Sequence, residues 1–268
     1  MHHENTPAAR ELVHDACQPL TRAARANLPA KPDDSHAAFH WSTQHDGLLR
    51  TEPMSRTTAL AFDFDPARYV VLVDDEPHAT LLLADVDHAG AEAWLDDVLV
   101  RRGMKPANVA EMPYTLPFSP DWSQFQSLAP RVAELGRAYA AINGALTDFI
   151  ETLPALQPGP SPVTLWPHHF DMATLVQLVH GDAETAPSIG VGFSPGDDNY
   201  AMPYLYCSPY PQPGDEARHD PPPGWQWHTQ GFVSLVLTTP HDDAGALAND
   251  FRQAFQVAMT TLPEGIGA

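Results

Sequence analysis

The sequence predicts an α+β fold with antiparallel sheets in two β-rich units, each closed by a helix, and a long central helix between them. Three observations lead to this prediction. Segments in both halves of the chain alternate apolar and polar side chains with a period of two, which is typical of half-buried strands. A long segment between the halves has helical periodicity. Each half ends in an Asp- and His-rich turn followed by an amphipathic helix, so the two units have a related outline.

Residues 1–35 are expected to form an N-terminal helical segment. Apolar residues cover one face of 6–28, and Pro19 interrupts that face, which predicts a kink or two short helices. The first α+β unit, 36–121, then contains a meander of three consecutive strands at 58–65, 69–73 and 80–83.

A helix over 89–102 closes the first unit, because Arg101 and Arg102 suit a helix C-terminus and Gly103 is a natural stop. The central helix is expected over 122–155, divided near Pro130 into a short and a longer piece.

The second α+β unit, 163–268, follows a Pro- and Gly-rich linker. It ends in an amphipathic helix over 244–262. Its strands are expected at 163–168, 189–193, 203–207 and 231–238. Together with the preceding segments this unit is compatible with one compact domain.

The charge balance argues against nucleic-acid partners. The chain has 14 basic and 34 acidic residues and a net charge of −20, so phosphate backbones and anionic membrane surfaces would be repelled. No stretch reaches the ~20 apolar residues that span a bilayer, and the start of the chain does not resemble a secretory signal. A cytoplasmic protein is therefore expected. Cys17 and Cys207 form no redox or zinc motif and are expected to be buried thiols.

The densest cluster of chemically useful residues lies at the start of the second unit. On a continuous strand His169 and Asp171 would point the same way, with Phe170 behind them in the core. With His168 they would supply ligands to a divalent metal, or His169 would act as a base oriented by the carboxylate. The alternative is a structural brace in which the imidazole N–H donates to the carboxylate.

A second group of candidates follows in the same unit. Asp197 lies in a Ser-Pro-Gly-Asp turn, where it is either a turn aspartate or a carboxylate held over a pocket. Tyr204 and Tyr206 share one face of a strand and would form an aromatic, hydroxyl-bearing wall for a small ligand. The Pro-rich loop 209–224 is either a lid over that ligand or a surface excursion.

The better-known catalytic and nucleotide-binding motifs are missing. The sequence has no Walker loop, no G-x-G-x-x-G, no H-E-x-x-H and no G-x-S-x-G. Most ATPases, dehydrogenases, zincins and α/β-hydrolases are thereby excluded.

Three short motifs occur in order: W-P-H-H-F-D at 166–171, S-P-G-D at 194–197 and P-Y-L-Y at 203–206. Together they resemble a family of bacterial proteins of unknown function, domain of unknown function 5996, and the likeness covers most of the chain. In that family the first motif commonly has glutamate at the position of His168, and an acidic residue is usual at the position of Met202. The resemblance implies no activity. The two missing acids weaken a carboxylate-rich metal site, whereas a histidine at 168 suits a softer metal.

Two functions are compatible with these residues. The first is a non-catalytic binding or structural/interaction module, in which the motifs brace the two units. The alternative is a metal- or small-ligand-binding enzyme of the hydrolase type, with a site around His169, Asp171 and Asp197. The base rate of structural over catalytic histidines favours the first.

Overall fold

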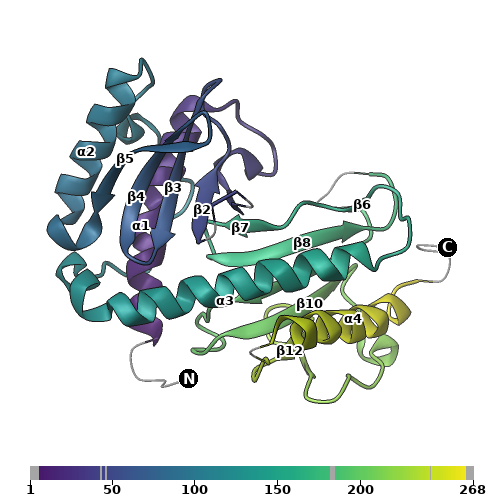
Figure 1. The fold of residues 1–268 in the computed structure, drawn as a ribbon. Coiled ribbons are helices and arrows are strands. Elements are labelled where there is room, and N and C mark those ends of the chain that lie inside the picture. The colour runs from purple at the N-terminus through teal and green to yellow at the C-terminus, as the bar shows by residue number, and fades with distance from the viewer. Residues whose placement is uncertain (1–5, 43, 46, 182–184, 242, 264–268) are drawn as a thin grey trace. The chain divides into compact units, whose positions relative to one another are not determined.

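The computed structural model describes residues 6–42, 44–45, 47–181, 185–241 and 243–263. It confirms a mixed fold of helices and antiparallel strands (Figure 1). The chain divides into two compact units, one of residues 1–138 with 165–170 and the other of residues 139–164 with 171–268. Each unit has its own helices and its own antiparallel strands.

The strands of the first unit run in the order β7-β1-β2-β3-β4-β5, and every pair is antiparallel. Their bounds are β1 (Phe39–Trp41), β2 (Leu48–Thr51), β3 (Thr58–Phe64), β4 (Ala67–Val73), β5 (Glu76–Leu82) and β7 (Thr164–Trp166). The predicted meander is thus β3, β4 and β5. Asp74 and Asp75 connect β4 to β5 with φ of 52° and 63°. Aspartate tolerates this left-handed conformation, which two-residue hairpin turns require.

The helices of the first unit are α1 (Thr6–Asn27), α2 (His88–Arg101) and the first part of α3 (Phe125–Glu151), with short 3-10 helices η1 (Ser35–Ala37), η2 (Leu83–Asp85), η3 (Ala107–Val109) and η4 (Trp122–Gln124). Helix α1 packs against β2 and β3, and Tyr69 on β4 donates a hydrogen bond to its Ala16 carbonyl at 2.6 Å. Because it is buried on most sides, α1 places polar side chains such as His14 and Gln18 in the interior.

The predicted divisions of helices at two prolines were wrong, whereas a kink at Pro19 stays a prediction. Pro19 lies inside one continuous helix, α1, and Pro130 lies inside α3. Pro130 is the sixth residue of α3, so it forgoes one backbone hydrogen bond to the preceding turn, and the helix continues past it.

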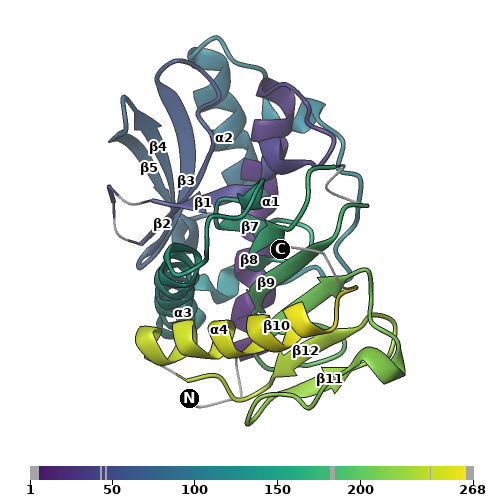
Figure 2. The same ribbon diagram turned by 90° about the vertical axis from the view of Figure 1, so that its right-hand side faces the viewer.

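The second unit places its strands in the order β8-β9-β10-β12-β11 (Figure 2). The short β6 pairs with β8. Their bounds are β6 (Gly159–Pro160), β8 (Asp171–Gln177), β9 (Ser188–Ser194), β10 (Tyr204–Tyr210), β11 (Gln226–His228) and β12 (Ser234–Leu237). Helix α4 (Ala244–Thr260) packs on β9 and β10, and η5 (Asp215–Ala217) lies in the loop after β10. The later half of α3 packs here too, since the rings of Tyr139 and Phe193 meet edge-on at 5.6 Å.

The strand predicted over 163–168 is confirmed only for 164–166, and its continuation through Asp171 was wrong. Strand β7 ends at Trp166 and β8 begins at Asp171, with a tight turn between them. The Phe170 N–H donates to the Trp166 carbonyl at 2.7 Å, and Phe170 has a φ of 58°. A left-handed residue cannot continue a strand, so the inferred alternation of His169, Phe170 and Asp171 does not exist.

Candidate functional site

The first of the three motifs forms the turn between β7 and β8. Residues 165–170 of this segment belong to the first unit. The Pro167 carbonyl accepts two hydrogen bonds from α1, from His14 Nε2 at 2.8 Å and from Gln18 Nε2 at 3.1 Å. Below the turn, the fully buried ring of Phe170 stacks on the His14 imidazole at 4.7 Å and an interplanar angle of 11°. These contacts anchor the turn on α1.

His14 is the buried histidine of this anchor. Only 6% of the residue is exposed. Burial is the main reason that its pKa falls from 6.5 to about 4, with the positive potentials of Arg10 and the neighbouring histidines acting in the same direction. The ring is therefore neutral at physiological pH. Since Nε2 faces a carbonyl, it must carry the proton and donate it.

His168 and His169 lie on the exposed side of the same turn. Their ring centroids are 4.3 Å apart, and the rings of Tyr114 and Trp166 approach His168 at 6.1 and 6.2 Å. Desolvation, followed by the potential of His169, lowers the pKa of His168 to about 4. Both residues belong to the first unit, whereas Asp171 belongs to the second.

In the second unit, Asp171 accepts a hydrogen bond from the Tyr206 hydroxyl across the intervening strand β9. Gly192 on β9 makes this possible. A Cβ built at Gly192 would lie 2.6 Å from the Tyr206 hydroxyl and 2.8 Å from the Ala173 Cβ, both far inside van der Waals contact. Glycine at 192 lets the tyrosine ring lie over the strand and reach the carboxylate.

Asp197 of the second motif also accepts hydrogen bonds from nearby residues. Its Oδ1 accepts from the backbone N–H groups of Asn199 and Tyr200 at 2.7 and 3.0 Å. Its Oδ2 accepts from the Tyr204 hydroxyl at 2.6 Å. Burial, reinforced by the adjacent carboxylates, raises the pKa values of Tyr204 and Tyr206, so both phenols remain neutral donors.

Two further residues, Tyr200 and His228, adjoin Tyr204 in the structure. The sequence alone did not connect them. The Tyr200 ring lies 5.0 Å from that of Tyr204, and its hydroxyl lies 3.0 Å from His228 Nδ1 on β11. His228 Nε2 is 2.7 Å from the Gln230 carbonyl and must donate to it, so Tyr200 donates to Nδ1 when the ring is neutral. Tyr200 and His228 are 28 residues apart in the sequence, and no local pattern reveals their proximity.

The predicted metal site receives no support from the geometry. Among the residues that the structure describes, no group of three or more His, Cys, Asp or Glu side chains is arranged to hold a metal ion. In the loop 209–224, interpreted from the sequence as either a lid or a surface excursion, the His219 carbonyl accepts a hydrogen bond from Trp227 Nε1 at 2.9 Å. Cys17 and Cys207 are buried free thiols whose pKa values burial raises.

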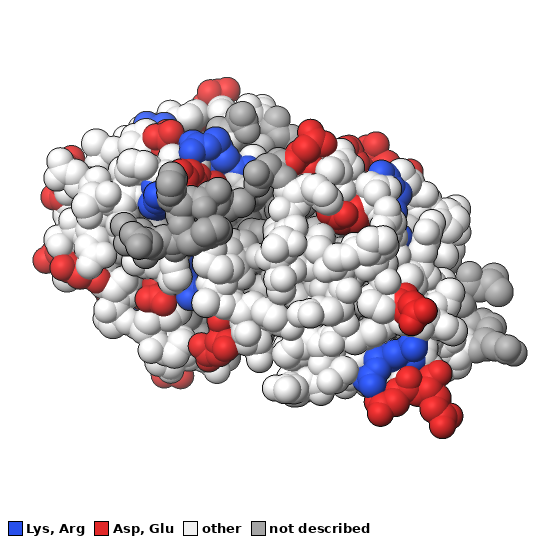
Figure 3. All heavy atoms as spheres, turned by 90° about the horizontal axis from the view of Figure 1, so that it is seen from below, with Lys and Arg blue, Asp and Glu red and all other residues white. Residues whose placement is uncertain are grey.

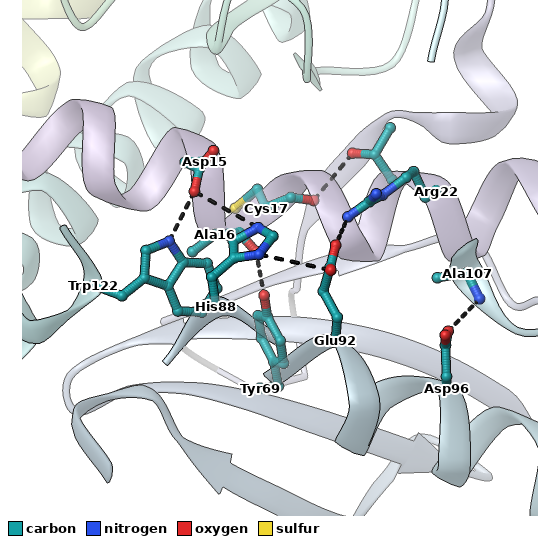
Figure 4. Close-up of polar contacts among 11 residues, drawn as sticks. Asp15, Ala16, Cys17, Arg22, Tyr69, His88, Glu92, Asp96, Ala107 and Trp122 are labelled. Carbon is teal, nitrogen blue, oxygen red and sulfur yellow. Dashed lines mark hydrogen bonds and ion pairs between the residues drawn. The ribbon is translucent and has the colours of Figure 1, made fainter. Parts of the chain in front are cut away.

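A further polar cluster, not recognised from the sequence, joins α1, α2 and η4 (Figure 4). Trp122 Nε1 donates to Asp15 Oδ2 at 2.8 Å. His88 Nε2 lies 3.9 Å from the same oxygen, and its Nδ1 lies 3.6 Å from Glu92 Oε2. Glu92 is also ion-paired with Arg22. We call these five residues the α1–α2 cluster.

On the face drawn in Figure 3, Lys and Arg side chains are few and dispersed among acidic and uncharged residues. No helix within the described ranges is long and apolar enough to cross a membrane. Models of known protein families, curated proteins and solved structures were compared with the chain, and none of them matches it. The likeness to domain of unknown function 5996 therefore stays a prediction.

Proposed function

We propose that the protein is a non-catalytic structural or interaction module whose three motifs brace its β-rich units. The observation that carries this proposal is the commitment of both candidate carboxylates to tyrosine hydroxyls. Asp197 accepts three hydrogen bonds from its own turn and from Tyr204, and Asp171 accepts one from Tyr206. A general base needs a carboxylate directed at the reacting proton, and these carboxylates are directed at neutral phenols.

The first motif supports the same proposal. Its Pro167 carbonyl is held by two side chains of α1, and its Phe170 ring is fully buried against His14. A buried aromatic residue with positive φ is retained only where the surrounding contacts hold it. The role we assign to the Trp-Pro-His-His-Phe segment is therefore to fasten a turn onto α1.

Asp197→Asn tests the proposal, with Asp198→Asn as its matched control. The amide nitrogen of asparagine cannot accept the hydrogen bonds that Asp197 receives, so a partly buried group loses a partner and the free energy of unfolding should fall by about 1–3 kcal/mol. Asp198 is exposed, and its replacement should have little effect on urea unfolding followed by circular dichroism. Equal stability of the two variants would contradict bracing.

Metal content separates this proposal from the hydrolase alternative. The protein would be purified without a metal-affinity column and measured by plasma mass spectrometry. We expect no stoichiometric zinc, nickel, manganese or iron. Near-stoichiometric metal that is lost in His169→Ala would replace the bracing proposal with a metal-dependent enzyme around His169, Asp171 and Asp197.

The remaining expectations belong to the same proposal. The net charge of −20 disfavours nucleic-acid and anionic membrane partners, and we place the protein in the cytoplasm. A small-molecule ligand would be bound by Tyr204 and Tyr206.

We also propose that the two units are related, because both closing helices begin at an aspartate N-cap. Asp87 accepts from the Gly90 N–H at 2.8 Å and Asp243 from the Ala246 N–H at 3.0 Å.

A further inference from the structure

His88 of the α1–α2 cluster lies between two carboxylates that come from different helices (Figure 4). One ring nitrogen faces Asp15 on α1 at 3.9 Å and the other faces Glu92 on α2 at 3.6 Å. The side chain is 42% exposed, so it exchanges protons with solvent. The Trp122 ring meets the imidazole edge-on at 4.8 Å, which limits its movement.

The two carboxylates are held in place independently of His88. Trp122 Nε1 donates to Asp15, and Arg22 is paired with Glu92. With a neutral imidazole the five residues carry two negative charges and one positive charge, and a proton on His88 balances them. A neutral imidazole also has only one N–H, so its other nitrogen would direct a lone pair at a carboxylate. Only the imidazolium has a donor for both carboxylates.

We propose that the proton on His88 is a latch that fastens the start of α2 to α1. Both facing carboxylates and the Asp87 carboxylate at the N-cap attract the imidazolium, whereas the positive end of the α2 dipole and Arg22 oppose it. Loss of the proton leaves Asp15 and Glu92 facing each other across a neutral ring. The first turn of α2 then opens more often, while the remainder of the first unit stays folded. This device is separate from the motif residues on which the proposed function rests.

Hydrogen–deuterium exchange of the full chain tests the latch. Amide protection in the first two turns of α2 would be measured at about pH 6 and about pH 8, after correction for intrinsic exchange rates. Partly exposed ion pairs are worth up to about 1 kcal/mol, so protection at the lower pH should be roughly two- to fivefold greater. This pH difference should disappear in His88→Gln and persist in His78→Gln, which replaces an exposed histidine on β5.

Asp15→Asn supplies a second variant, since it removes one carboxylate and keeps an oxygen that can accept from Trp122. The latch predicts a reduced pH difference in this variant. If His88→Gln lowers protection equally at both pH values, His88 is only a packing residue and the proposal is overturned. An unchanged pH difference in Asp15→Asn would overturn it as well. Because Asp171 and Asp197 are intact in these variants, either failure leaves the bracing proposal unaffected.

Discussion

The buried histidine of α1 makes a quantitative prediction about acid stability. His14 has a pKa of about 4 in the folded protein, lowered from 6.5 chiefly by burial. Between these values the unfolded chain binds a proton that the folded chain does not, so the free energy of unfolding falls as the pH falls. The stabilisation by neutral His14 is complete above pH 6.5 and is lost by about pH 4.

The size of the effect follows from the difference of 2.5 units between 6.5 and about 4. Each unit corresponds to about 1.4 kcal/mol, so His14 alone should remove about 3 kcal/mol between neutral pH and about pH 4. For a domain with a total stability of about 5–15 kcal/mol this is a large loss. His168, with a pKa of about 4, acts in the same direction, so the total acid sensitivity exceeds the share of His14.

The variant His14→Gln measures how much of the acid-induced loss of stability is due to His14. Glutamine suits a helix and its amide can still donate to the Pro167 carbonyl, but it has no group that titrates in this range. The variant should be less stable than wild type at neutral pH, because the stacking on Phe170 is lost. Urea unfolding at a series of pH values should show it losing about 3 kcal/mol less on acidification. His219→Gln, at an exposed side chain, is the control. A His14→Gln curve parallel to that of wild type would refute the argument.

Two pairs of glycine substitutions test the close approaches in the two units. Gly192→Ala should lower the free energy of unfolding by about 1–3 kcal/mol through overpacking. Gly190→Ala should leave stability unchanged or raise it by about 0.5–1 kcal/mol, because its Cβ would meet nothing nearer than 3.9 Å. In α3, Gly136→Ala brings a Cβ to 2.5 Å from Phe64 and should destabilise. Gly144→Ala meets nothing within 4 Å and should stabilise the helix by about 1 kcal/mol. Urea unfolding checks both pairs, and equal effects within either pair would contradict the packing described.

Local patterns were sufficient for much of the fold. The strands β3 and β4 and the helices α2 and α4 follow from apolar periodicity and from turn or capping residues within the same segment. The Asp74-Asp75 turn is one example, since its residue types tolerate the left-handed conformation that the hairpin needs. Such elements are predictable because the interactions that select them lie close together in the sequence.

The turn between β7 and β8 shows where local patterns fail. Nothing in Trp-Pro-His-His-Phe indicates a left-handed phenylalanine, and the contact that stabilises it comes from His14, 153 residues from Pro167. The α1–α2 cluster has the same origin, since Asp15 and His88 belong to helices separated by the whole meander. The individual candidates Asp171, Asp197, Tyr204 and Tyr206 were found from the sequence. The pairing of Asp171 with Tyr206 required the strand register.

The contact between Gly192 and Tyr206 also restricts how this protein can diverge. A side chain larger than hydrogen at 192 would displace the phenol from Asp171, so the first tolerated change has to be at 206. Once a smaller residue stands there, the constraint on 192 is lifted and the aspartate loses its donor. We therefore expect homologous sequences to change at 171, 192 and 206 as a set, with glycine retained wherever the tyrosine and the acid are both present.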